Sequence, residues 1–403
     1  MVLRETGGVS GAPFAAGAAA AKRSARRRNL NHPEGNAMPP AGLSVRNLTK
    51  RFALGATVVT AVDDVSFTVS GGEFFTMVGA SGCGKTTTLR MIAGLEKPTS
   101  GAITVDGRDF MAVPPQHRNI GMVFQSYALF PHLTIFENVA YGLRPRATPR
   151  AEVDHRVAAT LALLQLEPYA QRHPADLSGG PQQRVSIARA LVYEPTMLLL
   201  DEPLANLDAK LRVMMRDELR ALQRRLGITT LYVTHDQEEA TAVSDRIAVF
   251  NHGRLIQLGT PATIYAQPQS LFVADFIGRA NFLSARLDDR ALPAAGVTFG
   301  NGVRLRPALQ ITLSDDEAGT LASADDCVVM IRPEHLALDA TTGDIPCRVQ
   351  RVQLLGGLLR YTVQADISAK TIVVETTRAP AGVAEGGAAR LSIPAADAIL
   401  YHR

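Results

Sequence analysis

The chain reads Gly79-Ala80-Ser81-Gly82-Cys83-Gly84-Lys85-Thr86 between an apolar run at residues 74–78 and a helical pattern that follows it. The glycines allow backbone N–H groups to converge on phosphate oxygens, and the start of the helix adds the positive end of its dipole. The spacing predicts a phosphate-binding loop, in which Lys85 reaches the β- and γ-phosphates and the Thr86 hydroxyl binds Mg²⁺. A glycine turn that only joins two elements is the alternative.

Two acids, Asp201 and Glu202, end a second apolar run at residues 197–200. The carboxyl ends of parallel strands lie at the edge of a sheet where ligands bind. We expect Asp201 to hold Mg²⁺ and Glu202 to orient and polarise an attacking water, because phosphoryl transfer needs positioning and charge stabilisation. By itself an acid pair at a strand end is usually a solvated turn, so the phosphate loop is what favours the catalytic interpretation.

Two further polar residues follow apolar runs of the same expected sheet. Gln125 follows residues 120–124, and His235 follows residues 231–234. We expect Gln125 to contact Mg²⁺ and the attacking water, and His235 to reach the γ-phosphate. A lone glutamine or histidine at a strand end is more often structural, so it is their position in one sheet that supports both assignments.

A second segment with the properties of an anion-binding helix start reads Leu177-Ser178-Gly179-Gly180-Pro181. Serine is a favoured N-cap, the glycines free the backbone, and the helical pattern that follows is amphipathic. Proline is tolerated in a first helical turn, where its missing N–H costs no internal hydrogen bond. An ordinary capped helix would be the interpretation of this segment if nothing else were known.

Between residues 43 and 278 these motifs stand in the order found in the nucleotide-binding subunits of ABC transporters, which the chain resembles. The order is Walker A loop, Q-loop (Gln125), LSGG segment, Walker B acids, D-loop (residues 205–208) and H-loop (His235). The resemblance implies two copies that sandwich two ATP molecules, each between the Walker A loop of one copy and residues 178–180 of the other. Two departures are Pro181, where Gln or Glu is more usual, and Ala205, where Ser is common.

The resemblance also implies a set of ligand contacts. For ATP these are Phe52, which stacks on adenine, and Gly79, Ala80, Ser81, Gly82, Cys83, Gly84, Lys85, Thr86, Thr87, Ser178, Gly179, Gly180, Gln182 and Asp208. For Mg²⁺ they are Thr86, Gln125 and Asp201, and the catalytic residues are Glu202, His235 and Gln125.

Alternating strand and helix patterns predict a sheet with helices on both faces, and short strands dominate the rest of the chain. The expected fold class is α/β. A P-loop NTPase nucleotide-binding domain of the ABC type spans residues 42–278, with a helical subdomain at about 126–195. A small all-β, OB-like TOBE domain follows at residues 279–403, on the resemblance of Ile331-Arg332-Pro333-Glu334-His335. One helix is predicted over residues 150–172.

The net charge of +4 resides in residues 1–41, so the remaining residues are neutral, which argues against a nucleic-acid partner. We expect residues 1–41 to be an unstructured basic extension, with translation starting at Met1 or at Met38. No run approaches the roughly 20 apolar residues of a membrane-spanning helix. The 3 cysteines form neither a disulfide framework nor a metal cluster, which is typical of a cytoplasmic protein.

The TOBE-like tail and residues 122–132 resemble ATPases of bacterial importers for polyamines (spermidine or putrescine), ferric iron or phosphonate. The resemblance implies a homodimer, two permease partners and a periplasmic or surface solute-binding protein, at the cytoplasmic face of the plasma membrane. Tyr127, Leu129 and Phe130 are expected to form the groove for a permease coupling helix, or else part of the core. A soluble non-transport ABC ATPase and an exporter ATPase are the alternatives. The single cassette argues against the first, and the tail argues against the second.

Overall fold

The structure, a computed structural model, describes residues 42–403 except 56, 147, 289–294, 320, 322, 324 and 325. The predicted basic extension at residues 1–41, and with it the choice between Met1 and Met38, lies outside the described residues. The described residues belong to one compact unit. None of their helices is long and apolar enough to cross a membrane.

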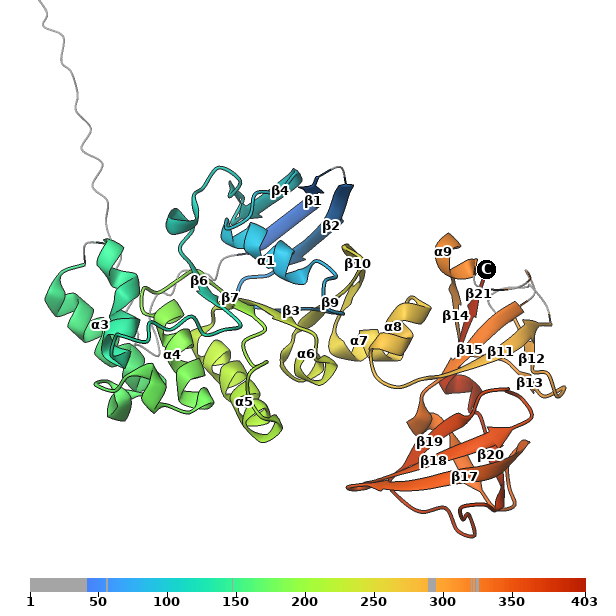
Figure 1. Cartoon of the computed structure of the whole chain (residues 1–403). Helices are drawn as coiled ribbons and strands as arrows, with labels where there is room; N and C mark the ends of the chain where they lie inside the picture. The colour runs from blue at the N-terminus through green and yellow to red at the C-terminus, as the bar shows by residue number, and fades with distance from the viewer. Residues whose placement is uncertain are drawn as a thin grey trace, which may run out of the picture. The chain divides into compact units, whose positions relative to one another are not determined.

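A six-stranded sheet of order β10-β9-β3-β8-β7-β6 forms the centre of the N-terminal part (Figure 1). Its strands are β3 (Phe74–Gly79), β6 (Ile120–Val123), β7 (Met197–Asp201), β8 (Thr229–Thr234), β9 (Arg246–Asn251) and β10 (Arg254–Gly259). All neighbours are parallel except β9 and β10. Because β3, β7 and β8 are buried along their whole length, their sequences are mostly apolar rather than alternating.

A smaller antiparallel sheet of order β2-β1-β4-β5 shares a core with the central sheet and with α1 (Lys85–Ala93). Its strands are β1 (Leu43–Leu54), β2 (Thr57–Val69), β4 (Ser100–Val105) and β5 (Arg108–Asp109). Phe67 of β2 stacks on Phe75 of β3, with ring centroids 5.0 Å apart. The helix that follows the phosphate loop is therefore packed into a core that two sheets share.

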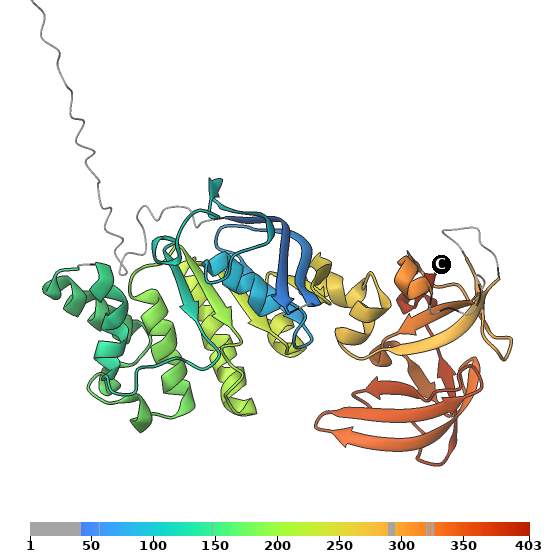
Figure 2. The same cartoon turned by 45° about the horizontal axis from the view of Figure 1, so that its top comes forward.

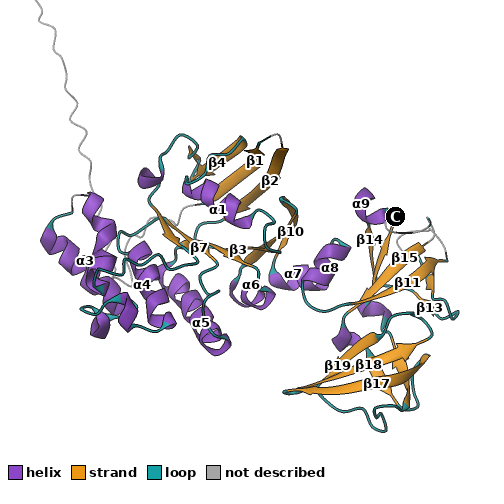
Figure 3. Ribbon diagram, viewed as in Figure 1, coloured by secondary structure: helices purple, strands orange, loops and turns teal. Residues whose placement is uncertain are grey.

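Helices α2 (Ile135–Ala140), α3 (Arg150–Leu163) and α4 (Gly179–Leu191) gather at one end of the central sheet (Figure 3). The remaining helices before residue 280 are α5 (Ala209–Leu226), α6 (Gln237–Val243), α7 (Pro261–Ala266) and α8 (Leu271–Phe276). The single helix predicted over residues 150–172 is wrong in its second part. α3 ends at Leu163 because Gln165 adopts a φ of 57°, and Pro168 lies in a short 3-10 turn (Glu167–Tyr169).

The C-terminal part consists of two sheets over one apolar core, of order β13-β12-β11-β15-β21-β14 and β16-β20-β17-β18-β19 (Figure 2). Its elements are β11 (Asn281–Leu287), β12 (Val297–Thr298), β13 (Arg304–Leu305), β14 (Leu309–Thr312), α9 (Asp315–Ala318), β15 (Asp326–Ile331), β16 (Ala337–Asp339), β17 (Ile345–Leu355), β18 (Leu358–Ala365), β19 (Ile372–Thr376), β20 (Ala388–Ser392) and β21 (Ile399–His402). An α/β fold followed by an all-β part confirms the predicted fold class.

Arg332, in the segment that suggested the TOBE resemblance, is a structural anchor. Its side chain is buried and donates to the carbonyl oxygens of Ala274, Arg279 and Tyr265 at 2.9–3.1 Å. It also lies 4.3 Å from the centre of the Tyr265 ring, and the Tyr265 hydroxyl donates to Glu334. Burial, followed by this hydrogen bond, raises the pKa of Tyr265 to about 12. The Arg-Pro-Glu segment thus fastens the first C-terminal strands to α7 and α8.

Candidate functional site

The phosphate loop lies between β3 and α1, where the sequence places it. The buried Lys85 ammonium donates to the carbonyl oxygens of Gly79 at 2.7 Å and Ala80 at 2.9 Å. Gly84 has a φ of +102°, and a Cβ there would lie 2.4 Å from the Ala61 carbonyl oxygen. Only glycine fits this position, because a side chain there would clash with the backbone of β2.

The other predicted loop residues differ in their exposure. Ala80, Ser81 and Gly82 are exposed, Thr86 and Thr87 are partly buried, and the Cys83 thiol is buried 3.6 Å from the Lys85 ammonium. The exposed backbone of residues 80–82 is the part of the loop open to an incoming anion.

Thr86 and Asp201 join the two nucleotide motifs, since Thr86 Oγ1 donates to Asp201 Oδ1 at 2.8 Å. Asp201 ends β7 and is buried. Burial is the largest influence on its carboxyl and raises its pKa, while the Thr86 hydrogen bond opposes that rise. A hydroxyl and a buried carboxylate are hard oxygen donors, and a cation would relieve the cost of burying the charge. The pair therefore fits Mg²⁺.

Glu202, Gln125 and His235 converge at the same edge of the sheet. Gln125 Nε2 donates to Glu202 Oε2 at 3.1 Å, and His235 Nδ1 lies 3.3 Å from that same oxygen. Glu202 has a φ of 46°, a left-handed conformation that costs free energy for a residue with a side chain. Its backbone N–H donates to Val233 of β8 at 3.0 Å, which holds this turn in place. Side chains that follow three different strands thus meet at one carboxylate oxygen.

The D-loop contains Asn206, to which the sequence alone assigned no role. Asn206 Nδ2 donates to the Gln125 backbone carbonyl at 2.7 Å, so it ties the D-loop to the Q-loop. Asp208 caps α5 by accepting from the Leu211 N–H at 2.9 Å, and its side chain is exposed. In the sequence, the only feature that pointed to this contact was the position of Asn206 four residues after Glu202.

The LSGG segment begins α4 as expected, but Ser178 does not cap it with its side chain. Ser178 is exposed, Gly179 is partly buried, and Gly180 is buried. Gln182 Nε2 donates to the carbonyl oxygens of Pro174 and Leu177, so it supports the segment from within the chain. Within the described residues, no hydrogen bond joins residues 178–180 to the phosphate loop. The Ser178 hydroxyl is left available to an external group.

Phe52, the predicted adenine-stacking residue, lies near the end of β1 and is partly buried. The Lys50 ammonium lies 4.7 Å from the centre of its ring, and Lys50 also pairs with Glu96 at 2.6 Å. The Lys50 ammonium lies over the Phe52 ring, which agrees with a role for this ring as a stacking platform.

The segment after Gln125 is fixed by Arg189 of α4, a contact that sequence reasoning missed. Arg189 donates to the carbonyl oxygens of Tyr127 at 2.8 Å and Ala128 at 2.6 Å. Both residues have positive φ values, 57° and 50°, so their carbonyls turn toward the helix. Tyr127 is buried in a cluster with Leu204 and Leu207, which gives it a core role, whereas Leu129 and Phe130 are partly buried.

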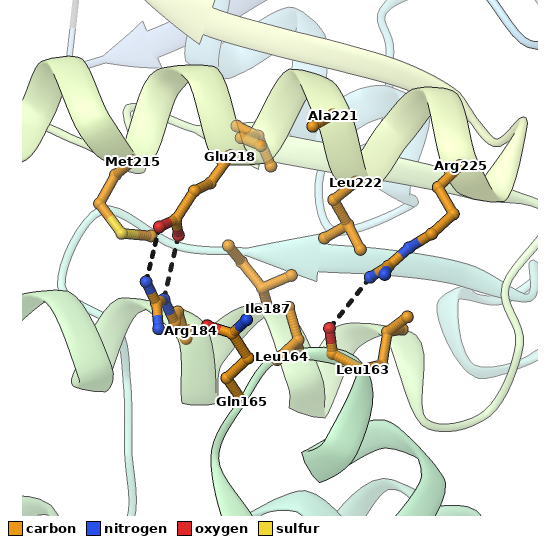
Figure 4. A pocket seen from close by; sticks show the side chains of 11 residues that line it. Leu163, Leu164, Gln165, Arg184, Ile187, Met215, Glu218, Ala221, Leu222 and Arg225 are labelled. Atoms are coloured by element: carbon orange, nitrogen blue, oxygen red, sulfur yellow. Dashed lines mark hydrogen bonds and ion pairs between the residues drawn. The ribbon is translucent and has the colours of Figure 1, made fainter.

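A larger cavity of about 300 Å³ lies between the end of α3, α4 and α5 (Figure 4). Its floor is apolar, with Leu164, Ile187 and Leu222 among its lining residues. The ion pair between Arg184 and Glu218 and the bond from Arg225 to the Leu163 carbonyl span it. None of the predicted site residues lines this cavity, so it is separate from the nucleotide motifs.

A phosphate loop between a parallel strand and a helix, joined to two acids at the end of a second strand, defines a P-loop ATPase. The model of the ABC transporter family matches residues 62–205, and that of the TOBE domain matches residues 329–400. The chain is also similar to the "Spermidine/putrescine import ATP-binding protein PotA" of Thermobifida fusca, at 46% identity over 82% of this chain and 85% of the relative. It belongs to the ABC transporter ATP-binding proteins, and it is an ABC-type transport ATPase with a C-terminal TOBE domain.

Further relatives agree. The protein of the same name from Rubrobacter xylanophilus is 46% identical, covering 85% of this chain and 88% of the relative. The "Fe(3+) ions import ATP-binding protein FbpC 1" of Rhizobium meliloti is 53% identical, covering 70% of this chain and 83% of the relative. Among solved structures, a dimer of the ATP-binding cassette MJ0796 bound to ADP and Pi is similar, with 34% identity and a TM-score of 0.50. That match covers 54% of this chain and 98% of the cassette.

Proposed function

We propose that this chain is the ATP-hydrolysing subunit of a bacterial importer, in which two copies close around two ATP molecules and drive two permeases. The observation that carries the proposal is the meeting of Gln125 and His235 at one oxygen of Glu202. The adjacent pair of Thr86 and Asp201 supports a magnesium site beside that carboxylate.

Each side chain has a task in this proposal. Lys85 balances the charge of the β- and γ-phosphates, and Thr86, Asp201 and Gln125 would hold Mg²⁺, which would neutralise negative charge on the phosphate groups. Glu202 accepts a hydrogen bond from the attacking water and aligns it with the γ-phosphate. His235 stabilises the γ-phosphate oxygens as charge develops on them.

The second half of each site is assigned to the other copy. The exposed Ser178 hydroxyl and the start of α4 offer donors to an anion, yet they make no contact with the phosphate loop of their own chain. The solved cassette similar to this chain is a dimer, which supports the same assembly here. Closure of the two copies would then couple ATP binding to the motion of the permeases.

Polyamine import is the proposed task, because spermidine/putrescine importer subunits are prominent among the relatives. Ferric iron is the second candidate, on the 53% identity to the Rhizobium meliloti protein. Either task requires two permeases, a solute-binding protein and a place at the cytoplasmic face of the membrane. Deletion of the gene, followed by uptake of labelled spermidine, putrescine and ferric iron, discriminates between them. An import function would be contradicted if the deletion left the uptake of all three solutes unchanged. Co-purification of the protein with ribosomes instead of permeases would contradict it as well.

The catalytic assignment is tested with Glu202→Gln, which keeps the shape of the side chain and removes its charge. The variant should bind ATP with Mg²⁺ as the wild type does, and its turnover should fall by about a hundredfold or more. Glu167→Gln, at an exposed position in a 3-10 turn, is the matched control and should hydrolyse ATP normally. Wild-type turnover in Glu202→Gln would show that another group activates the water.

A further inference from the structure

Arg212 contacts the D-loop and the H-loop, which flank the candidate catalytic pair of Glu202 and His235. It lies in the first turn of α5, where its backbone N–H donates to the Asp208 carbonyl at 2.8 Å. Its Nη2 donates to the Leu207 carbonyl at 3.0 Å, and its Nη1 lies 3.6 Å from Asp236 Oδ2. One guanidinium group therefore spans the D-loop, which follows β7, and the H-loop, which follows β8.

Glu239 of α6 provides a second, buried partner for this guanidinium. Its Oε1 lies 3.7 Å from Arg212 Nε, and its Oε2 accepts from Tyr232 Oη at 2.6 Å and Thr234 Oγ1 at 2.8 Å. Burial, and then the neighbouring Glu239 charge, raise the pKa of Tyr232 well above its ordinary value. Tyr232 therefore remains a hydrogen-bond donor, and Glu239 is fixed to both β8 and α6.

His235 depends on these neighbours for its position. Its side chain is 55% exposed, and among the described residues its one ion pair is with Glu202. Thr234 before it is bound by Glu239, and Asp236 after it caps α6 by accepting from the N–H groups of Glu238 and Glu239. The ring is therefore placed by the backbone on either side of it rather than by packing.

The catalytic pair and the Arg212 cluster face one small cavity of about 30 Å³. Glu202 and His235 line it together with Arg212, Asp236 and Glu239. A shift of the Arg212 guanidinium would therefore change the wall of the cavity that Glu202 and His235 also line.

Stability alone is a poor explanation for this cluster. The two carboxylate contacts of Arg212, at 3.6 and 3.7 Å, are longer than charge-assisted hydrogen bonds. Its Nε is buried and has no hydrogen-bond partner among the described residues. Buried polar atoms are rarely left without a partner, so the position of this Nε needs an explanation other than stability.

We propose that Arg212 is a positioning residue, which couples the D-loop to the H-loop and so sets the place of His235 relative to Glu202. The proposal rests on the proposed function, in which two copies close around ATP, and adds that the exposed D-loop residues Asn206 and Asp208 respond to that closure. Contact at the D-loop would then move or fix the Leu207 carbonyl, and Arg212 would pass this change to Asp236 and His235.

The test measures ATP hydrolysis by the full chain with Arg212→Gln, Arg212→Lys and Asp236→Asn. Arg212→Gln should lower kcat about tenfold and leave KM for ATP within about twofold of wild type, because it misplaces a catalytic group without touching the nucleotide. Arg212→Lys keeps the charge but cannot bridge both loops, so its kcat should be intermediate. Asp236→Asn keeps the helix cap and weakens the link, and it serves if Arg212→Gln does not fold. Arg216→Gln, one turn further along α5, is the matched control and should match wild type, because within the described part of the chain Arg216 pairs only with its neighbour Asp217.

A double-mutant cycle with His235→Ala, measured in single-turnover reactions, shows whether Arg212 acts through the histidine. Combined with His235→Ala, Arg212→Gln should lower the rate no further, because its effect passes through the missing ring. The proposal would be overturned if the losses from Arg212→Gln and His235→Ala were additive. It would also be overturned if Arg212→Gln raised KM and left kcat unchanged, or if Arg212→Gln and Arg216→Gln had equal rates. A wild-type chain without ATPase activity would instead contradict the proposed function itself.

Discussion

Thr86 Oγ1 and Asp201 Oδ1 lie 2.8 Å apart, although 115 residues separate them in the chain. Asp201 ends β7, whereas Thr86 lies in the first turn of α1, which follows β3, and β8 runs between β3 and β7. The contact is therefore made beyond the carboxyl ends of the strands, where the start of α1 and the end of β7 meet. This geometry places an oxygen pair suited to Mg²⁺ next to the Glu202 carboxylate.

Asp201→Asn should raise the Tm of the protein without nucleotide at neutral pH. Burial raises the folded-state pKa of this carboxyl above its unfolded value, so its ionisation destabilises the fold as the pH rises through the folded pKa. Below the unfolded pKa both states are protonated, and the substitution should have little effect. Thermal unfolding at acidic and at neutral pH checks this, and a lower Tm at neutral pH would contradict it. Binding of ATP with Mg²⁺ should be weakened in the same variant.

Gly84→Ala should disable the phosphate loop. The φ of +102° and the 2.4 Å approach of a Cβ to the Ala61 carbonyl oxygen predict a cost of about 2 kcal/mol or more. Isothermal titration should show that the Gly84→Ala variant has lost its affinity for ATP although it still folds. Gly300→Ala, where no atom lies within 4 Å of the added Cβ, is the control. Equal ATP affinity in both variants would mean that the loop tolerates the methyl group.

Arg332→Ala should destabilise the protein by about 2–4 kcal/mol, because it leaves the carbonyls of Ala274, Arg279 and Tyr265 without this donor. Urea unfolding measures the loss. Arg348→Ala, at an exposed position on β17, should unfold as the wild type does. If Arg332→Ala matched that control, the Arg-Pro-Glu segment would not be the anchor described above.

Arg189→Ala should uncouple transport from hydrolysis. The carbonyls of Tyr127 and Ala128 would lose their donor, and the segment after the Q-loop would loosen. Solute uptake in reconstituted transporter is expected to fall several-fold more than ATPase activity. Arg184→Ala removes a surface ion pair from the same helix and should leave the ratio of uptake to hydrolysis unchanged. An equal fall of both activities in Arg189→Ala would point to a plain loss of stability.

Patterns that act locally were predictable from the sequence. The phosphate loop, the buried strand before Asp201 and the order of the α/β and all-β parts follow from glycine spacing and from apolar runs between turns. The helix over residues 150–172 failed because no sequence pattern shows that Gln165 adopts a positive φ. The convergence of Gln125 and His235 on one oxygen of Glu202 needs the register of three strands.

Contacts made by long side chains could not be predicted from the sequence, for a related reason. Arg189 and Arg212 lie in ordinary helix patterns and Arg332 follows strand β15, and a basic residue at such a position is usually solvated. Their roles arise because carbonyl or carboxylate groups distant in sequence turn toward them. Such partners become visible only when the loops have been placed in space.

ATP hydrolysis by this protein is proposed to take place at nucleotide sites that two copies share. Two variants of Glu202→Gln test this directly, one with Lys85→Ala and one with Ser178→Arg, since neither copy alone should trap ATP with Mg²⁺. When the two are mixed, one site would combine the intact Lys85 of one copy with the intact Ser178 of the other. Trapped ATP should then appear, whereas a mixture of either variant with a copy of Glu202→Gln that carries both further changes should trap none. Absence of trapped ATP in the first mixture, with both proteins folded, would contradict a shared site.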